Sequence, residues 1–263
     1  MILRKPVERR HRAKLPRARV SGKPPSMTAR SDEVHVARRF RGPPTSGNGG
    51  YVCGLLAEWI DGPAEVTLHA PTPLEVPLHR TQADGAVTLA DGVTLLATAR
   101  PLAEPLELDV PAPPDLLEIE AAALAFPGSD RHLFPGCFVC GPDRDPGDGL
   151  CLFTGESPHR DVAVADWLPA AELNDIDGFI AHRFIWAALD CPSSFGLGDP
   201  TVRMLLARME ARIARPVSSG ERLRVTGWKL GSEGRKHRAA SALHDEAGQV
   251  VAIARALWIE PRA

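Results

Sequence analysis

Two short segments, residues 51–60 and 180–190, are almost entirely apolar, and each is followed by several runs of alternating apolar and polar residues. A segment of about ten residues with so little polar surface predicts a helix that is buried on most of its sides. The alternating runs predict strands, because successive side chains of a strand point to opposite faces of a sheet. Helix and strands follow in the same order in both halves, which predicts an internally duplicated α+β protein.

In the first half, a strand is expected around Val34 and Val36, before a loop over residues 42–50 that is rich in glycine and proline. No regular element accommodates that loop, which leads directly into the apolar helix. Turns of the sequence Asp-Gly at 84–85 and 91–92 predict hairpins between the strands that follow. The predicted strands cover residues 65–69, 74–81, 86–90 and 93–99.

The second half begins after residues 101–114, which hold five prolines and predict a connecting segment, and a short helix predicted over 115–126. The loop 174–178 precedes the second apolar helix. The predicted strands of this half cover residues 150–154, 162–167, 202–214, 222–231, 235–243 and 250–258.

The chain of 263 residues has a net charge of only −2, but the charge is unevenly distributed. Residues 1–41 hold 13 of the 31 Lys and Arg and only 3 of the 33 Asp and Glu, so the rest of the chain is acidic. The basic segment 1–30 has no apolar periodicity and is predicted to be disordered. It is interpreted as a solvated tail, as an arm that binds nucleic acid, or as the result of a start codon placed too early. The position of Met27, just before the first strand, favours the last interpretation.

Several classes of protein are excluded by composition. The sequence contains no run of about 18 apolar residues, so it predicts no membrane span. The acidic composition after residue 41 disfavours nucleic acid as a partner, since phosphate binding needs clustered cations. Five cysteines, an odd number in a long chain, do not indicate a disulfide framework. We therefore expect a cytoplasmic protein with reduced thiols.

A motif in the second half resembles a known family. The segment Cys137-Phe-Val-Cys-Gly-Pro-Asp-Arg-Asp-Pro-Gly-Asp-Gly-Leu150 is similar to the opening of PaaI-type hotdog thioesterases, and Phe184-Ile-Trp-Ala-Ala-Leu-Asp190 is similar to their central helix. The resemblance covers residues 137–260. It is looser in the first half, where Asn48-Gly49-Gly50 replaces the family's His-Gly-Gly.

The resemblance implies a double hotdog, in which two antiparallel sheets each wrap around a central buried helix. The first hotdog would cover residues 31–100 and the second 136–263, with a linker and a short helix over 101–135. It also implies an acyl-CoA thioesterase without a cofactor, acting as a monomer or a homodimer. A non-catalytic protein that binds an acyl group or acyl-CoA is the alternative.

Thioester hydrolysis needs a base or nucleophile and a donor for the developing oxyanion. Asp190 ends an otherwise apolar helix and is the leading candidate for the carboxylate, although it could instead cap the following loop. In the family, the donor comes from the start of the partner helix, which here predicts the amides of Gly50 and Tyr51. The same glycines could serve only to make a tight turn into the helix.

Other residues are assigned to supporting roles. Asn48 and Gly49 are expected to contact substrate beside the catalytic amides. Arg235 and Lys236, at the start of a strand, are candidates for the phosphates of coenzyme A, or are solvated charges. Glu58 and His182 form a second-choice site at the opposite helix ends, where Arg183 and Phe184 replace the family's glycines.

Cys137 and Cys140 form a CxxC motif, with Cys151 and His132 close by in the sequence. A zinc site would suit these residue types, but a second CxxC, which would make the case strong, is absent from the sequence. The motif precedes a predicted strand rather than linking a strand to a helix, which disfavours a redox pair. We therefore expect these cysteines to pack inside a loop and to hold no metal.

Overall fold

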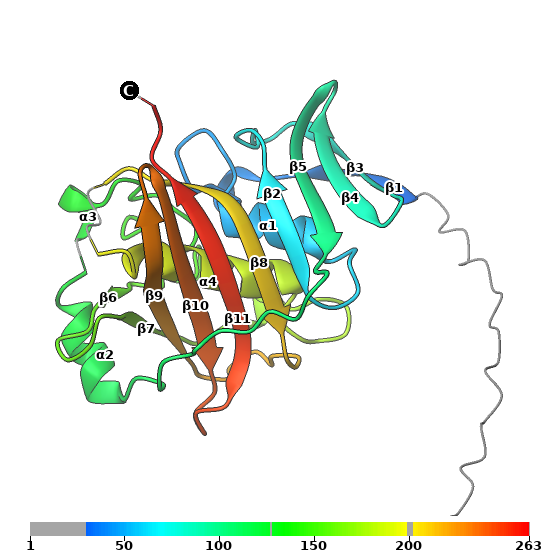
Figure 1. The fold of residues 1–263 in the computed structure, drawn as a ribbon. Coiled ribbons are helices and arrows are strands. Elements are labelled where there is room, and N and C mark those ends of the chain that lie inside the picture. Colours follow the sequence, from blue (N-terminus) through cyan, green and yellow to red (C-terminus); the bar gives the residue numbers. More distant parts are fainter. Residues whose placement is uncertain (1–29, 127, 199–201, 263) are drawn as a thin grey trace, which may run out of the picture.

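The computed structural model describes residues 30–126, 128–198 and 202–262, so the predicted basic tail lies outside the described residues except for Arg30. Two helices, α1 (Gly49–Ala57) and α4 (His182–Phe195), pack against each other behind a large twisted sheet (Figure 1). They correspond to the two apolar segments of the sequence. Both helices contact the sheet from the same side, where the main core lies.

Within the described residues, eleven antiparallel strands form one sheet in the order β1-β3-β4-β5-β2-β8-β11-β10-β9-β7-β6. The first half contributes β1 (Arg30–His35), β2 (Ala64–Leu68), β3 (Pro77–Ala83), β4 (Ala86–Asp91) and β5 (Thr94–Pro101). The second half contributes β6 (Gly155–Glu156), β7 (Ala163–Trp167), β8 (Leu205–Ile213), β9 (Leu223–Glu233), β10 (Lys236–His244) and β11 (Val250–Ile259).

The strands of the two halves therefore form one continuous sheet, and the arrangement of two sheets that the family resemblance implied is not confirmed. The junction is the pairing of β2 with β8, in which Ala64 lies opposite Ala211 and Thr67 opposite Arg208. A strand at a sheet edge has unpaired backbone N–H and C=O groups, and pairing the two edges satisfies both rows. This correction follows from tertiary packing, because alternation along a strand does not specify its neighbours.

Most elements differ from their predicted bounds by a few residues, and two differences change the structure of a segment. The strand expected over 150–154 is an irregular segment, because the N–H groups of Leu150 and Leu152 donate to the carbonyls of Phe138 and Val139 in the preceding loop. The second apolar helix continues through Pro192 to Phe195 instead of ending at residue 190. The segment 150–154, just before β6, therefore forms its backbone hydrogen bonds with the CxxC segment and not with the sheet.

Aromatic side chains from both halves meet beneath the sheet. Phe40 and Tyr51 stack with ring centroids 4.3 Å apart, and the rings of Phe138 and Phe184 pack around them at 5.0–6.3 Å. Phe40 belongs to a short 3₁₀ helix, η1 (Arg38–Phe40). Because this cluster combines residues from both halves, the halves share one core.

The proline-rich segment after β5 crosses the opposite face of the sheet (Figure 1). Its apolar side chains, such as Leu106, pack on Trp228 and Ile253 and cover that face of the second half. The segment leads to α2 (Leu116–Ala123), where the Asp115 side chain accepts the N–H of Glu118 at 2.8 Å and caps the helix. A one-turn helix, α3 (Gly128–Arg131), and a 3₁₀ helix, η2 (Ala171–Leu173), complete the described elements.

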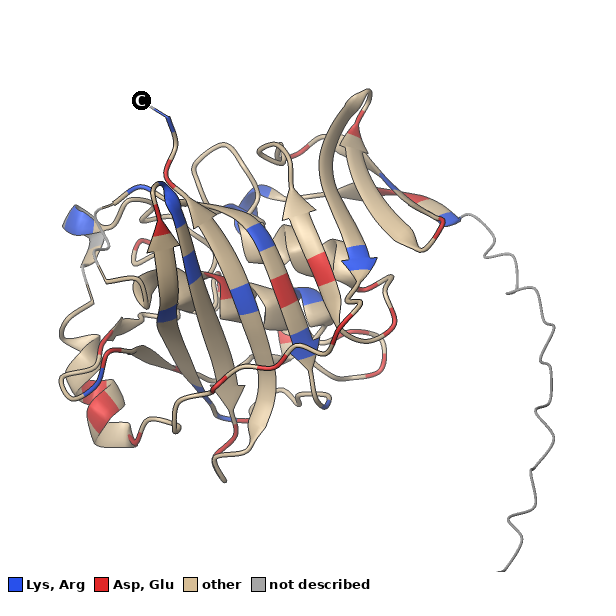
Figure 2. Cartoon of the chain, viewed as in Figure 1, with Lys and Arg blue, Asp and Glu red and all other residues tan. Residues whose placement is uncertain are grey.

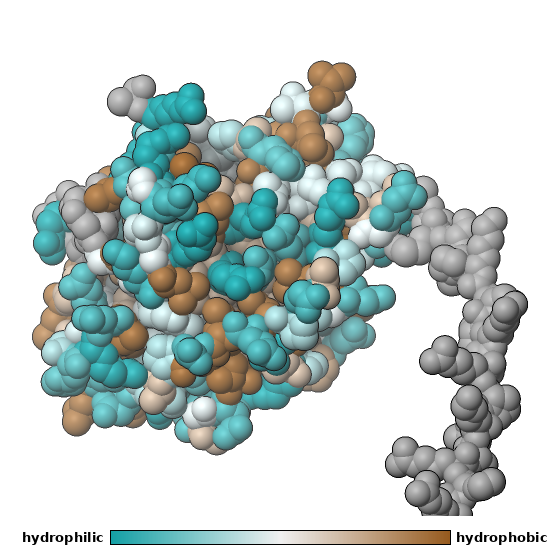
Figure 3. Space-filling view, viewed as in Figure 1, coloured by the Kyte–Doolittle hydropathy of each residue, from teal (hydrophilic) through white to brown (hydrophobic). Residues whose placement is uncertain are grey.

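Charges of both signs alternate across the exposed face of β2, β8 and β11 (Figure 2). Arg208 pairs with Glu65 across the junction of the halves, and Arg255 pairs with Glu210. Apolar side chains are scattered among hydrophilic ones on this face (Figure 3). None of the helices in the described ranges is long and apolar enough to cross a membrane.

Candidate active site

The side chain of Asp190 lies at the contact between α4 and the start of α1, where only 2% of the residue is exposed. Its Oδ2 accepts hydrogen bonds from the Gly50 N–H at 2.8 Å and from Asn48 Nδ2 at 2.9 Å. Its Oδ1 is buried and has no partner among the described residues. The second half thus places a carboxylate, with one oxygen held and one oxygen free, at the helix N-terminus of the first half.

Asn48 uses both ends of its amide to join the two helices. Its Oδ1 accepts the N–H of Tyr51 at 2.9 Å, which makes Asn48 the N-cap of α1. Its Nδ2 then points to Asp190, so the cap also fixes the carboxylate. An N-cap aspartate would cap the helix equally well but could not donate this second bond.

Burial raises the pKa of Asp190 to about 7, against the lowering effect of the Gly50 N–H. The nearby Cys137 raises the pKa further, and the amide of Asn48 lowers it. Desolvation dominates because the charged form loses its hydration.

Gly50 permits the close approach of the two helices. A Cβ added at Gly50 would meet the Cβ of Asp190, and would lie 2.7 Å from the carbonyl oxygen of Trp186 and 3.0 Å from Cα of Ala187. One turn later, a Cβ at Gly54 would meet Cα of Arg183. The sequence attributed the glycine at position 50 to ligand approach or a tight turn, whereas here it accommodates α4.

The amide groups at the start of α1 are mostly occupied. Gly50 N–H donates to Asp190, Tyr51 N–H donates to Asn48 Oδ1, and Val52 N–H donates to the Asn48 carbonyl. The oxyanion role predicted for the amides of Gly50 and Tyr51 therefore requires groups that already have partners in this structure. The N–H of Gly49 has none among the described residues.

A cavity of about 420 Å³ opens beside these groups. Asn48, Gly49 and Asp190 form part of its wall, whereas Gly50 and Tyr51 do not. Most of the remaining wall is apolar and includes Leu206 and Trp258. The cavity therefore offers an apolar volume that ends at a buried carboxylate.

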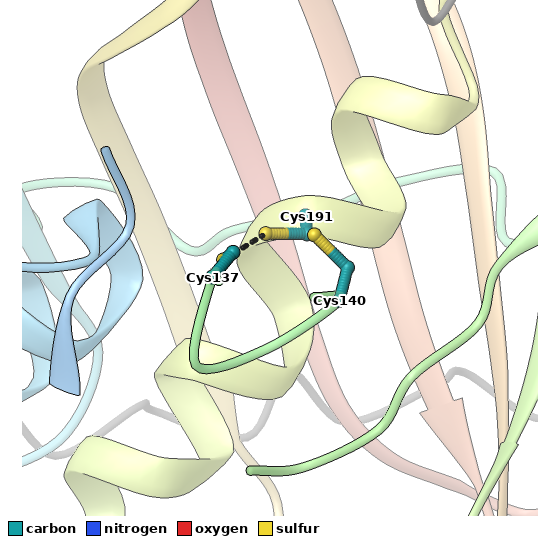
Figure 4. A group of neighbouring side chains, drawn as sticks. All are labelled: Cys137, Cys140 and Cys191. Atoms are coloured by element: carbon teal, nitrogen blue, oxygen red, sulfur yellow. Dashed lines mark hydrogen bonds between the residues drawn. The ribbon is translucent and has the colours of Figure 1, made fainter. Parts of the chain in front are cut away.

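Three cysteine thiols gather at the same wall (Figure 4). The Sγ atoms of Cys137, Cys140 and Cys191 all lie within 4.8 Å of one another, and those of Cys137 and Cys191 are 3.8 Å apart. Cys151 and His132, which the sequence placed beside the CxxC, do not belong to this group. Sequence spacing gave no signal for Cys191, because α4 brings it from far along the chain.

Glu58 and His182 lie at the end of the helix pair away from Asp190, where α1 ends at its C-cap Glu58 and α4 begins at His182. Glu58 Oε1 accepts the N–H of Arg183 at 3.4 Å and lies 3.2 Å from Arg183 Nε. Burial raises the pKa of Glu58, and the charge of Arg183 lowers it. A smaller cavity of about 150 Å³ is lined by His182 but not by Glu58.

The predicted phosphate contacts, Arg235 and Lys236, do not line the larger cavity but neighbour residues at its wall. Lys236 pairs across the sheet with Ile259, which lines that cavity, and Arg235 donates to the carbonyl of Glu260 at 2.7 Å. Arg203, which sequence reasoning missed, is an exposed cation that lines the cavity. Its position before β8 carries no motif that could have identified it.

No family model matches the chain, and no curated protein matches it either. Among solved structures, the fold is similar to a protein from Thermobifida fusca named as a thioesterase II, with a TM-score of 0.57 and 16% identity over 88% of this chain and 94% of that one. It is also similar to a protein from Novosphingobium aromaticivorans named as a thioesterase, with a TM-score of 0.58 and 14% identity over 88% and 96%. The tesB protein of Mycobacterium avium subspecies paratuberculosis gives a TM-score of 0.57 and 12% identity over 88% and 93%.

The chain resembles hotdog thioesterases in fold. The similarity confirms the resemblance that the sequence motifs indicated. It extends over both halves, because the matched region covers most of this chain and most of each neighbour. At these identities the comparison establishes the fold, and the chemistry has to be argued from the site.

Proposed function

We propose that this chain hydrolyses the thioester bond of an acyl-CoA in the cavity at the N-terminus of α1. The observation that carries the proposal is the position of Asp190, a buried carboxylate at the wall of an apolar cavity whose Oδ1 has no partner within the described part of the chain. Burying an unpartnered polar oxygen costs free energy, so its presence beside an open volume favours a role toward a ligand.

Asp190 acts as general base or as nucleophile. As a base, its free oxygen takes a proton from water while the water oxygen bonds to the thioester carbon. As a nucleophile, the carboxylate attacks that carbon, and water later hydrolyses the resulting anhydride. In both cases the carbon–sulfur bond breaks, and the thiolate leaving group ends as the free thiol. The bonds from Gly50 and Asn48 hold the other oxygen and orient the carboxylate.

The donor for the thioester oxygen is the N–H of Gly49. It is the amide at the start of α1 without a partner among the described residues, and Gly49 lines the cavity. The positive end of the helix dipole adds to its effect on a developing oxyanion. The amides of Gly50 and Tyr51 then act indirectly, because the first holds the carboxylate of Asp190 and the second holds the N-cap side chain of Asn48.

The substrate class follows from the cavity and its mouth. An apolar wall suits the acyl chain, because burying apolar surface is favourable. Arg203 at the rim, with Arg235 and Lys236 on the neighbouring β9–β10 turn, provides cations for the phosphates of coenzyme A.

Two helices in one chain supply both parts of the site. In this proposal residues 31–100 and 136–263 act as paired hotdog units joined by 101–135, the first offering the helix N-terminus and the second the carboxylate. A single chain is therefore sufficient for activity, and dimerisation is not required.

The test is thiol release from a panel of short, long and aromatic acyl-CoAs, with wild type, Asp190→Asn and Glu58→Gln compared in parallel. We expect Asp190→Asn to lower kcat by about 10²–10⁴-fold, the usual contribution of a positioned acid or base. Glu58→Gln is the matched control, since it changes the equivalent carboxylate at the other helix pair, and its rate should stay within about twofold of wild type.

An equal rate in Asp190→Asn and wild type would exclude Asp190 from the chemistry. A folded wild type that binds acyl-CoA but releases no thiol from any substrate would instead identify a non-catalytic acyl-CoA-binding protein.

A further inference from the structure

The three thiols at the cavity wall have the spacing of metal ligands. Cys137 and Cys140 come from the loop before β6, Cys191 comes from α4, and their sulfur atoms point toward one another (Figure 4). In a tetrahedral zinc site, Zn–S bonds of about 2.3 Å place two sulfurs about 3.8 Å apart. The Sγ atoms of Cys137 and Cys191 are 3.8 Å apart.

The CxxC loop is a tight turn that its own backbone holds. Gly141 N–H donates to the Cys137 carbonyl at 2.9 Å, and Phe138 N–H donates to the Arg41 carbonyl at 2.7 Å. A Cβ at Gly141 would lie 2.5 Å from backbone atoms of Cys137 and Pro135, so this tight turn needs glycine. The turn therefore fixes the backbone of Cys137 and Cys140 so that both sulfur atoms lie near that of Cys191.

The surroundings of the cluster provide independent support. Asn48 Nδ2 lies 3.9 Å from Cys137 Sγ and 3.9 Å from Cys191 Sγ. Two further buried polar atoms at this cavity lack partners in the described residues, namely Asp190 Oδ1 and His132 Nε2. All three cysteines also line the cavity, so the cluster has an open side.

We propose that Cys137, Cys140 and Cys191 bind one Zn²⁺ ion and that its fourth coordination position faces the cavity. Binding replaces the three thiol protons, which pass to solvent, and involves no change in oxidation state. Thiolates favour soft and borderline metal ions, and zinc accepts three protein ligands with the fourth position left to water or a ligand. Sequence analysis expected no metal because the sequence lacks a second CxxC, and Cys191 lies too far along the chain for spacing to indicate it.

The test measures the metal directly, with the full chain purified from zinc-supplemented medium. We expect about one zinc per chain by elemental mass spectrometry. After replacement of zinc with Co²⁺, a near-ultraviolet thiolate-to-cobalt charge-transfer band should appear. Cys137→Ser and Cys191→Ser should lose the bound zinc and weaken this band, whereas the control Cys151→Ser should keep both.

A second measurement covers the case in which the serine variants fail to fold. In wild type, bound zinc should protect Cys137, Cys140 and Cys191 from alkylation, and a chelator should expose them. Folded wild type with no retained zinc and no cobalt band would overturn the proposal, as would a disulfide between two of these cysteines. Asp190→Asn should keep its zinc even if it loses hydrolysis, so failure of the metal site and failure of the proposed hydrolysis are distinguishable.

Discussion

The N-termini of α1 and α4 each face a carboxylate from the other helix, but only the first adjoins a large cavity. At α1, Gly50 N–H donates to Asp190, and the carboxylate has no cation beside it in the described residues. At α4, Arg183 N–H donates to Glu58, and the guanidinium of the same Arg183 pairs with that carboxylate. The same contact of a helix N-terminus with a carboxylate thus occurs at both ends of the helix pair.

The residue that donates the N–H differs between the two ends. Glycine at position 50 adds no side chain beside Asp190, whereas arginine at position 183 supplies a counter-charge to Glu58. The cavities also differ, with about 420 Å³ beside Asp190 and about 150 Å³ near the other end, where His182 but not Glu58 lines the wall. The two ends therefore share a backbone-to-carboxylate contact, but only at α1 does the carboxylate line a cavity.

The largest effect is expected from placing a side chain at the closest point of the two helices. Gly50→Ala should destabilise the protein by about 3 kcal/mol, because the new Cβ would overlap the Trp186 carbonyl and the Asp190 side chain. Gly49→Ala is the comparison, since its Cβ would meet mainly the movable side chain of Leu206. Chemical denaturation measures the free energy of unfolding of both variants. Equal losses of stability would show that α1 is not packed more tightly at position 50 than at position 49.

Asn48 should contribute next, through its two hydrogen bonds. Asn48→Ala removes the cap of α1 and the donor to Asp190, and we expect a loss of about 2 kcal/mol in unfolding free energy. Asn48→Ser keeps a capping side chain but does not reach Asp190, so it separates the two bonds. If serine and alanine gave the same stability, the cap would contribute nothing.

Arg183 tests whether the second site is structural. Arg183→Met should cost about 1 kcal/mol, because it leaves the partly buried Glu58 without its ion pair. Thiol release should not change, since Asp190 and the larger cavity are untouched. A large fall in hydrolysis in this variant would contradict the distinction between the two ends.

The smallest effect concerns Arg215, which lines the smaller cavity and holds Glu221. The hydrogen bond from Arg215 keeps the pKa of Glu221 in the folded protein below its value in the unfolded chain. The pair therefore stabilises the fold fully at pH values above the unfolded-state pKa of Glu221, and this stabilisation is lost as the pH falls through its folded-state pKa. Arg215→Met should thus be less stable at pH 7, by under about 1 kcal/mol for this exposed pair.

The difference between Arg215→Met and wild type should shrink as the pH falls below the folded pKa of Glu221, because Glu221 is then protonated in both the folded and the unfolded state. Urea midpoints at a series of pH values measure it. A difference that stays constant with pH would mean that Arg215 acts through packing alone.

Local patterns predicted the elements well where the signal lies within a few residues. The Asp84-Gly85 turn has positive φ at both positions, 50° and 73°, as a two-residue hairpin requires. The apolar helices and the long strands of the second half also lie where periodicity placed them. The segment 150–154 differed because its backbone bonds go to the CxxC loop, which alternation cannot reveal.

The candidate site was predictable in its outline and not in its details. A carboxylate in an apolar helix pointed to Asp190, and the repeated order pointed to the start of the other helix as its partner. Which amides remain available there depends on Asn48 and Asp190 taking those of Tyr51 and Gly50, a fact of packing. The catalytic and binding roles of these residues stay predictions until the variants are measured.

The sequence by itself determined two buried helices, the turns between strands and the presence of a carboxylate in an apolar segment, because periodicity and turn chemistry act over a few neighbouring residues. Only the tertiary structure joined the halves into one sheet, brought Cys191 to the CxxC and, as far as the described residues show, left the amide of Gly49 rather than that of Gly50 unpaired. These features depend on which surfaces meet when helices and strands pack, and residues far apart in the chain decide that together.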